Sequence, residues 1–327
     1  MLNQSMPQIS ALSSRGRAFC GRGICFYGIL FFLLLPASIS AQNPPKRPRI
    51  LGIAEVRIFS TDLGAARNFY AKVLSAKETS ANAFSLNPRQ AIGLFAAPFP
   101  VPSNLLAEVV FETDDLGGLF RYLRAQKIQV NPNLVMVQGR DVIGPGYSTF
   151  SLNDPEGHRI SFIGRTKQSR PPNPLPTTRP TRAQHIIHAG FVVHDRAAED
   201  RLYKDVLGFH VYWHGGMKDD ETSWVDMQVP DGTDWLEYML NVSPDADHHT
   251  LGVMNHIGLG VPDIKAAREQ LIKNGWKGTE QPKIGRDGKW QLNLYDPDDT
   301  RVELMEFTPT HKPCCSEYTG PHPGQKP

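Results

Sequence analysis

Cysteine is scarce in this chain of 327 residues, and none lies between Cys25 and Cys314. A chain of this length can bury enough apolar surface to fold without disulfides. The folded region has no thiolates that could bind a metal. Any metal site in it must therefore be built from histidines and carboxylates.

An excess of charge of one sign is also lacking, because 35 basic and 33 acidic residues give a formal net charge of +2. A nucleic-acid-binding protein would need a clustered positive surface, and nothing in this composition indicates one. We expect the partner to be a small-molecule substrate and not nucleic acid. The sequence does not predict the oligomeric state.

Long apolar runs are limited to one, Ile24 to Leu35, which is too short to span a bilayer comfortably, where about 20 residues are needed. Arginines and no acidic residue precede it, and Pro36 and a run of small residues follow. This pattern predicts an export signal over residues 1–41, cleaved before Gln42. We expect a periplasmic or secreted protein without a membrane anchor; an uncleaved anchor is the alternative.

Proline is concentrated between residues 166 and 184, a segment that predicts an extended connector. It divides the mature chain into an N-terminal half, residues 50–165, and a C-terminal half, residues 185–308. The Pro- and Gly-rich tail, residues 309–327, is expected to be irregular. Its adjacent Cys314 and Cys315 could be free thiols, a metal trap or an intermolecular bridge, and the sequence does not choose among these.

A repeated phrase occurs twice in each half: a short β-rich run, an aspartate that can cap a helix, and then apolar residues at helical spacing. Strand-like segments follow, so each copy predicts a β-α-β-β-β unit. The first and third copies share their helix (NFYAKVL and RLYKDVL), and the second and fourth share a late turn (NDPEG and YDPDD). The four copies begin at AEVRIFSTD (54–62), AEVVFETDD (107–115), HAGFVVHD (188–195) and HIGLGVPD (256–263).

The C-terminal half carries one histidine and one glutamate in each copy. Glu237 follows His188 by 49 residues, and Glu303 follows His256 by 47. Strand alternation places these side chains on a common face, and a glutamate in an apolar strand is costly to bury unless it is paired or binds a metal. The four residues therefore predict a site for a divalent Fe, Mn, Co, Ni or Zn ion.

The N-terminal half lacks such a set. Glu55 and Glu108 stand where the histidines would be, and an apolar run at 92–94 and Ser161 stand where the glutamates would be. We interpret this half as a degenerate one with a structural or substrate-shaping role. Its two glutamates are expected to be solvated or paired.

The phrases HAGFVVHD, HIGLGVPD and DPDDTRVELMEF resemble those of the vicinal oxygen chelate superfamily, and the resemblance covers nearly all of residues 50–308. Members include glyoxalase I, extradiol dioxygenases, methylmalonyl-CoA epimerase and the bleomycin- and fosfomycin-resistance proteins. The resemblance implies an α+β fold of four βαβββ modules that form two curved mixed-sheet pairs. It also implies that metal ligands come from the first and last strands of a module.

The resemblance to glyoxalase I implies a metal-dependent isomerase or lyase that acts on a small molecule with two neighbouring oxygens. Glu303 is then the first choice for the catalytic base and Glu237 the second. An Fe(II) extradiol-type dioxygenase is the alternative, although Asn293 occupies the place where that class has a tyrosine. A non-catalytic binding protein of the resistance type is the third possibility, disfavoured by the four ligands.

Two basic residues lie in the Gly-flanked loop IGRDGKW. Arg286 and Lys289 could meet an anionic substrate there, but we expect a solvated hairpin.

Overall fold

The computed structural model describes residues 46–131, 135–137, 147–165 and 183–324. The predicted export signal, residues 1–41, and most of the predicted connector, residues 166–184, lie outside the described residues. No helix within the described ranges is both long and apolar enough to cross a membrane.

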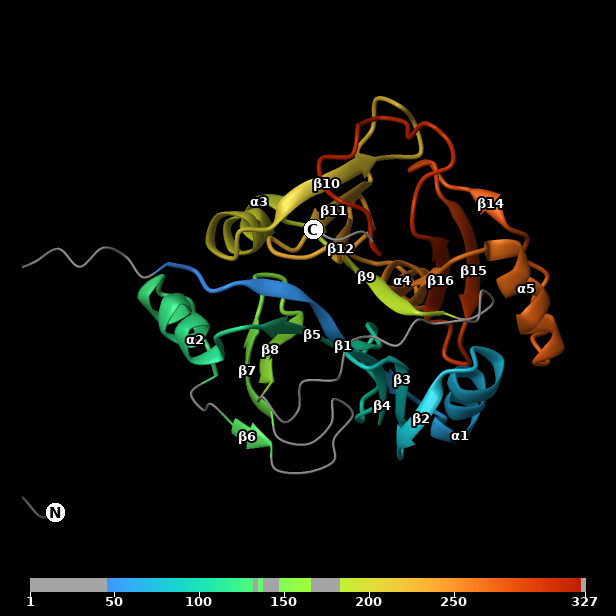
Figure 1. The fold of residues 1–327 in the computed structure, drawn as a ribbon, viewed down its shortest axis with the longest axis horizontal. Coiled ribbons are helices and arrows are strands. Elements are labelled where there is room, and N and C mark those ends of the chain that lie inside the picture. Colours follow the sequence, from blue (N-terminus) through green and yellow to red (C-terminus); the bar gives the residue numbers. More distant parts are fainter. Residues whose placement is uncertain (1–45, 132–134, 138–146, 166–182, 325–327) are drawn as a thin grey trace, which may run out of the picture. The chain divides into compact units, whose positions relative to one another are not determined.

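Two eight-stranded mixed sheets contain the described strands, one in each half of the chain (Figure 1). The N-terminal sheet has the order β2-β3-β4-β1-β5-β8-β7-β6, and the C-terminal sheet has the order β10-β11-β12-β9-β13-β16-β15-β14. The N-terminal strands are β1 (Ile50–Ser60), β2 (Lys77–Ser80), β3 (Ala83–Asn87), β4 (Gln90–Ala96), β5 (Leu106–Thr113), β6 (Val135–Val137), β7 (Tyr147–Asn153) and β8 (Arg159–Arg165). The C-terminal strands are β9 (His185–Val192), β10 (His210–Gly215), β11 (Trp224–Gln228), β12 (Trp235–Met239), β13 (His256–Val261), β14 (Lys283–Ile284), β15 (Trp290–Tyr295) and β16 (Arg301–Glu306).

The strand pairing confirms the four predicted βαβββ modules. In each sheet the first strand of one module pairs antiparallel with the first strand of the next, as β1 does with β5 and β9 with β13. Each first strand also pairs parallel with the last strand of its own module. The second half therefore repeats the first, strand by strand, and its central seam is the β9–β13 pair.

The four repeated aspartates begin helices, as predicted. Asp62, Asp115, Asp195 and Asp263 each accept a hydrogen bond from a backbone N–H in the first turn of the following helix. In the first and third modules the helix continues as a π-helix. The helices are α1 (Leu63–Arg67) with η1 (Asn68–Val73), α2 (Leu116–Ala125), α3 (Arg196–Asp200) with η2 (Arg201–Val206), α4 (His248–Met254) and α5 (Ile264–Lys273).

A reciprocal pair of buried hydrogen bonds joins the two halves. Tyr70 in η1 donates to Asp296 in the last turn of the fourth module, at 3.0 Å. Tyr203 in η2 donates to Asp154 in the matching turn of the second module, at 3.1 Å. The helix motif shared by modules one and three thus contacts the turn motif shared by modules two and four. The contact occurs twice, once in each direction between the halves.

The same two turns also bind the first strand of the opposite half. Asp298 accepts hydrogen bonds from Ser60 and Thr61 at the end of β1. Glu156, at the matching turn position, accepts the backbone N–H groups of His194 and Asp195 after β9. Carboxylates that accept backbone N–H groups fix the direction in which a chain enters its helix. Each half therefore orders the start of the helix in the other.

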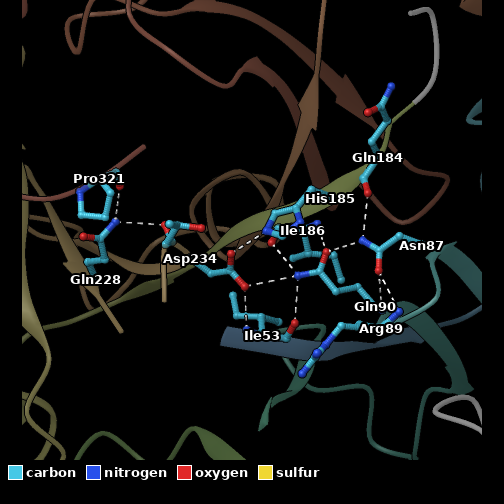
Figure 2. Close-up of polar contacts among 11 residues, drawn as sticks. Ile53, Asn87, Arg89, Gln90, Gln184, His185, Ile186, Gln228, Asp234 and Pro321 are labelled. Atoms are coloured by element: carbon cyan, nitrogen blue, oxygen red, sulfur yellow. Dashed lines mark hydrogen bonds and ion pairs between the residues drawn. The ribbon is translucent and has the colours of Figure 1, made fainter. Parts of the chain in front are cut away.

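A third contact between the halves centres on Asp234, just before β12 (Figure 2). Its carboxylate accepts the backbone N–H of Ile53 in β1 at 2.8 Å and the side-chain amide of Gln90 in β4 at 3.2 Å. It also pairs with the imidazole of His185 in β9. Gln90 in turn accepts the backbone N–H of Ile186. This network holds β1 and β4 against β9.

The tail beyond β16 forms no helix or strand in residues 309–324 and lies along β10 of the third module and the loop between β14 and β15 of the fourth. Thr319 donates to the backbone carbonyl of Val211, and Tyr318 donates to that of Asp287 at 2.7 Å. Cys314 and Cys315 are joined to each other by a disulfide. None of the three arrangements expected for these cysteines is therefore present in the structure.

Stability should depend on pH through His185. Burial lowers the pKa of this imidazole, but the Asp234 carboxylate outweighs it, so the pKa is raised above the ordinary value of about 6.5. The pair stabilises the folded state fully below that ordinary value, and the contribution is lost as pH rises through the folded pKa. Urea unfolding of His185→Gln should show a deficit against wild type that is larger at about pH 5.5 than at about pH 9. The exposed His311→Gln serves as the control. A deficit that grows with pH would contradict this assignment.

Candidate metal centre

The structure brings together the four residues that the sequence predicts as ligands. His188 comes from β9, Glu237 from β12, His256 from β13 and Glu303 from β16, which are the first and last strands of the third and fourth modules. The side chains of both histidines are buried, and those of Glu237 and Glu303 are 14% and 6% exposed. The set therefore lies in the interior and opens towards solvent on the side of Glu237.

The donor atoms face one another at distances suited to one shared ion. The Nε2 atoms of His188 and His256 are 3.1 Å apart. The Oε2 atom of Glu237 is 2.9 Å from Nε2 of His256. Glu303 Oε2 lies 3.5 Å from His188 Nε2 and 3.7 Å from His256 Nε2. Ligands bonded to a small divalent ion at about 2.0–2.2 Å lie roughly 3–3.5 Å from each other. These four residues, His188, Glu237, His256 and Glu303, are called the quartet below. Their spacing fits such an ion.

Strand register and two glycines explain why the imidazoles can meet. In the antiparallel β9–β13 pair, His188 lies opposite Gly258 and His256 lies opposite Gly190. A Cβ atom added to Gly258 would be 2.0 Å from Cε1 of His188, and one added to Gly190 would be 2.0 Å from Cε1 of His256. Each ring therefore lies over a facing glycine, where any side chain would displace it.

Neighbouring groups orient the two rings. Nδ1 of His256 lies 2.9 Å from the carbonyl oxygen of Met254, to which it donates, so Nε2 presents its lone pair to the site. The ring of His188 stacks on Trp235, with centroids 5.0 Å apart. Both contacts hold the rings in the orientation that a metal ligand requires.

Arg301 is the nearest cation to the quartet and was not singled out as a functional residue from the sequence. Its guanidinium lies 2.8 Å from Nε2 of His256. Burial would raise the pKa of Glu303, but Arg301 and the imidazoles hold that pKa well below its ordinary value. Burial and then Arg301 lower the pKa of His256. The site therefore favours an ionised Glu303 and a neutral His256, the forms in which these side chains bind metals.

A cavity of about 310 Å³ is lined by three of the four residues, His188, Glu237 and Glu303. Aromatic and methionine side chains form much of its wall, and Asp226, Asn293 and Arg301 add polar groups. Asp226 and Asn293 lie directly across the strand ladder from Glu237 and Glu303. Their positions follow from the strand register. The sequence alone does not give this register, so the two residues were not predicted to line the site. The apolar part of the wall includes Trp213, Met217, Trp224, Trp235, Met239 and Met305.

The expectation of a solvated hairpin is wrong for Lys289. Its side chain is wholly buried, with Nζ 4.5 Å from the ring centre of Trp235 and about 5 Å from those of Tyr212 and Tyr318. Burial lowers the pKa of this ammonium group. Arg286 does line the cavity, but it is paired with Asp219. Lys289 therefore lies against the ring of Trp235 and does not itself line the cavity.

The N-terminal sheet has an arginine at the place that corresponds to the candidate metal site of the C-terminal sheet. Arg57 lies opposite Glu108, as Gly190 lies opposite His256. Its guanidinium is 3.0 Å from Glu55 and 2.7 Å from Glu108. Gly93 and Ser161 occupy the register positions of Glu237 and Glu303. Of the two alternatives for these glutamates, pairing is confirmed and solvation is wrong, because both are buried.

The comparisons with known proteins agree with this architecture. A sequence model of the Glyoxalase/Bleomycin resistance protein/Dioxygenase superfamily matches residues 52–162 and 172–304. The chain belongs to this superfamily. The expected family and fold are thereby confirmed. A search among curated protein sequences gives no match.

Solved structures of extradiol dioxygenases are similar to this chain in fold. The substrate complex of homoprotocatechuate 2,3-dioxygenase from Brevibacterium fuscum is 19% identical, with a TM-score of 0.59 over 86% of this chain and 85% of that one. The enzyme of the same name from Arthrobacter globiformis is 18% identical, with a TM-score of 0.59 over 80% of each chain. At this identity the likeness shows the fold alone.

Removing the arginine that pairs with Glu55 and Glu108 should destabilise the protein. Arg57→Leu would leave the buried Glu55 carboxylate without its guanidinium and should cost about 3 kcal/mol of unfolding free energy, measured with urea near neutral pH. Arg57→Lys should cost less, and Glu55→Gln combined with Arg57→Leu should recover most of the loss. An Arg57→Leu protein as stable as wild type would show that the ion pair is not needed.

Proposed function

We propose that the protein is a metal-dependent isomerase or lyase that acts on a small molecule with two neighbouring oxygens. The observation that carries this proposal is the four-residue set. Glu237 lies within 2.9 Å of the His256 imidazole and faces the same cavity as Glu303. A second carboxylate ligand is what separates the glyoxalase I pattern from a His–His–carboxylate triad.

The quartet would hold a divalent ion through two neutral imidazoles and two carboxylates, a donor set suited to Fe, Mn, Co, Ni or Zn. Such an ion, when bound, acts as a Lewis acid that draws electron density from substrate oxygens. The chain itself contributes four ligand atoms that lie close together and a cavity next to them. Two oxygens of a substrate could enter from that open side.

Glu303 is our first choice for the group that moves a proton, and Glu237 the second. The Glu303 carboxylate makes longer contacts with both imidazoles than the contact between Glu237 and His256, so it is less firmly engaged. Arg301 and the imidazoles hold its pKa below the ordinary value, so the carboxylate is ionised. A base at this position would take a proton from one carbon of the substrate and return it to the next, without net oxidation.

The cavity wall favours a substrate with an apolar or aromatic body. Trp213, Trp224 and Trp235 present flat apolar faces, and methionines fill the gaps between them. Arg301 is placed to contact an oxygen or a carboxylate of the substrate close to the quartet.

Extradiol ring cleavage is the second candidate, because the similar structures are homoprotocatechuate dioxygenases and the cavity has an aromatic wall. Two features weigh against it. Asn293, and not a tyrosine, lines the cavity beside Glu303, and His188 is the one histidine among the described cavity-lining residues. A binding protein without catalysis would not need the quartet.

We also propose that the protein is exported. The disulfide between Cys314 and Cys315 suits an oxidising compartment, where such bonds persist. Together with the pattern of residues 1–41 this supports a periplasmic or secreted location.

Two isosteric substitutions separate the enzyme classes. Glu303→Gln should keep most of the metal and lower the rate of proton exchange on 2-hydroxy ketones about 10²–10⁴-fold, because it removes the base. Glu237→Gln should lower metal content and activity together, whereas a three-ligand dioxygenase would survive it largely intact. Metal analysis and NMR of deuterium exchange measure these effects, with Asn293→Ser as a control on the cavity wall. Oxygen consumption with 3,4-dihydroxyphenylacetate, unchanged in Glu237→Gln, would overturn the isomerase proposal in favour of ring cleavage.

A further inference from the structure

A second group of metal-binding side chains lies where the two halves meet, away from the quartet. Asp154 stands in the turn between β7 and β8, His158 closes that turn, and Glu199 comes from α3 of the other half. One ligand atom from each lies within 4.8 Å of the others. Asp154 and Glu199 are buried, and the side chain of His158 is 16% exposed, which leaves a path for a small ion.

One oxygen of this group has no hydrogen-bond partner in the part of the chain that the structure describes. Oε1 of Glu199 accepts the backbone N–H of Glu156 at 2.9 Å, but Oε2 is fully buried and makes no hydrogen bond. A carboxylate oxygen of Glu199 lies within 4.8 Å of one of Asp154. The Asp154 carboxylate lies 2.8 Å from Nδ1 of His158 and accepts from the Tyr203 hydroxyl. Two buried carboxylates this close repel each other unless a cation or a proton lies between them.

The other half provides an internal comparison, because the same contact is made there without these groups. Asp296 matches Asp154 and accepts from Tyr70, as Asp154 accepts from Tyr203. Thr300 stands four residues after Asp296, as His158 stands four after Asp154, and Ala66 stands four after the cap Asp62, as Glu199 does after Asp195. The tyrosine–aspartate contact therefore requires neither an imidazole nor a second carboxylate.

We propose that Asp154, His158 and Glu199 bind a second divalent cation, of the zinc class, which ties α3 to the turn between β7 and β8. One imidazole and two carboxylates form a donor set that zinc accepts, with a fourth position open to water from the side of His158. The Tyr203 hydroxyl orients the Asp154 carboxylate from behind, as hydrogen-bonding partners of metal ligands do. The role of this ion is structural, because it joins the two halves of the chain.

A proton is the competing way to neutralise the group. Burial and the Asp154 carboxylate raise the pKa of Glu199 to about 8, so a cation-free protein keeps this carboxyl protonated at neutral pH. A glutamine in its place mimics that neutral form and keeps the acceptor for the Glu156 N–H. Glu199→Gln should therefore fold normally and still lose the ion.

Native mass spectrometry of the untagged protein, titrated with Zn²⁺ alone, counts the ions directly. No thiol reductant is added, because reduced Cys314 and Cys315 would offer further ligands beside Asp219. We expect wild type to bind two zinc ions, one of them at the quartet, and Glu199→Gln, His158→Gln and Asp154→Asn to bind one fewer each. The matched control Asp296→Asn removes the equivalent carboxylate of the other half and should bind as many ions as wild type.

The outcomes separate this site from the quartet. Wild type with one ion and Glu199→Gln with none would still support the second site while contradicting the proposed catalytic one. Equal counts in wild type and Glu199→Gln, or loss of an ion in Asp296→Asn as well, would overturn the proposal and leave a protonated carboxyl as the explanation.

Discussion

The buried meeting of two imidazoles and two carboxylates at the β9–β13 seam is the constraint on which the C-terminal half depends. Carboxylates are costly to bury without a positive partner, and His188, His256 and Arg301 lie close to Glu303. The facing glycines give the rings room, and the strand register sets the spacing of the donors. The geometry is that of a site prepared for a cation.

The N-terminal half meets the same constraint in another way. Glu55 and Glu108 occupy the places of the histidines, and the guanidinium of Arg57 extends between them from the strand position that is Gly190 in the other half. A covalently attached cation cannot exchange with substrate or metal. This half keeps the fold of the duplicated unit and the contacts that order the other half, while the C-terminal half keeps the open site.

Contacts between the two halves help to position the strands that carry the candidate ligands. Asp234 joins β1 and β4 to β9 immediately before β12, the strand that carries Glu237. The turns of each half fix the helix that follows the first strand of the other. The strand that carries His188 is thus positioned by residues from both halves.

Much of this could be predicted from the sequence, because it rests on local and periodic signals. The capping aspartates, the four modules and the convergence of His188, Glu237, His256 and Glu303 all follow from spacing and alternation. Lys289 could not be placed, since its burial depends on rings from three distant segments, of which Tyr318 lies in the irregular tail. Arg57 and Arg301 were missed as internal cations, because which carboxylate or imidazole each arginine meets depends on the strand register.

Anomalous diffraction from crystals of the metal-loaded protein, measured at the absorption edge of that metal, shows whether the four side chains hold one ion. We expect a peak within bonding distance of Nε2 of His188 and of His256 and of one carboxylate oxygen each from Glu237 and Glu303. A peak that lacks Glu237 among its neighbours, or no peak among the four side chains, would contradict it.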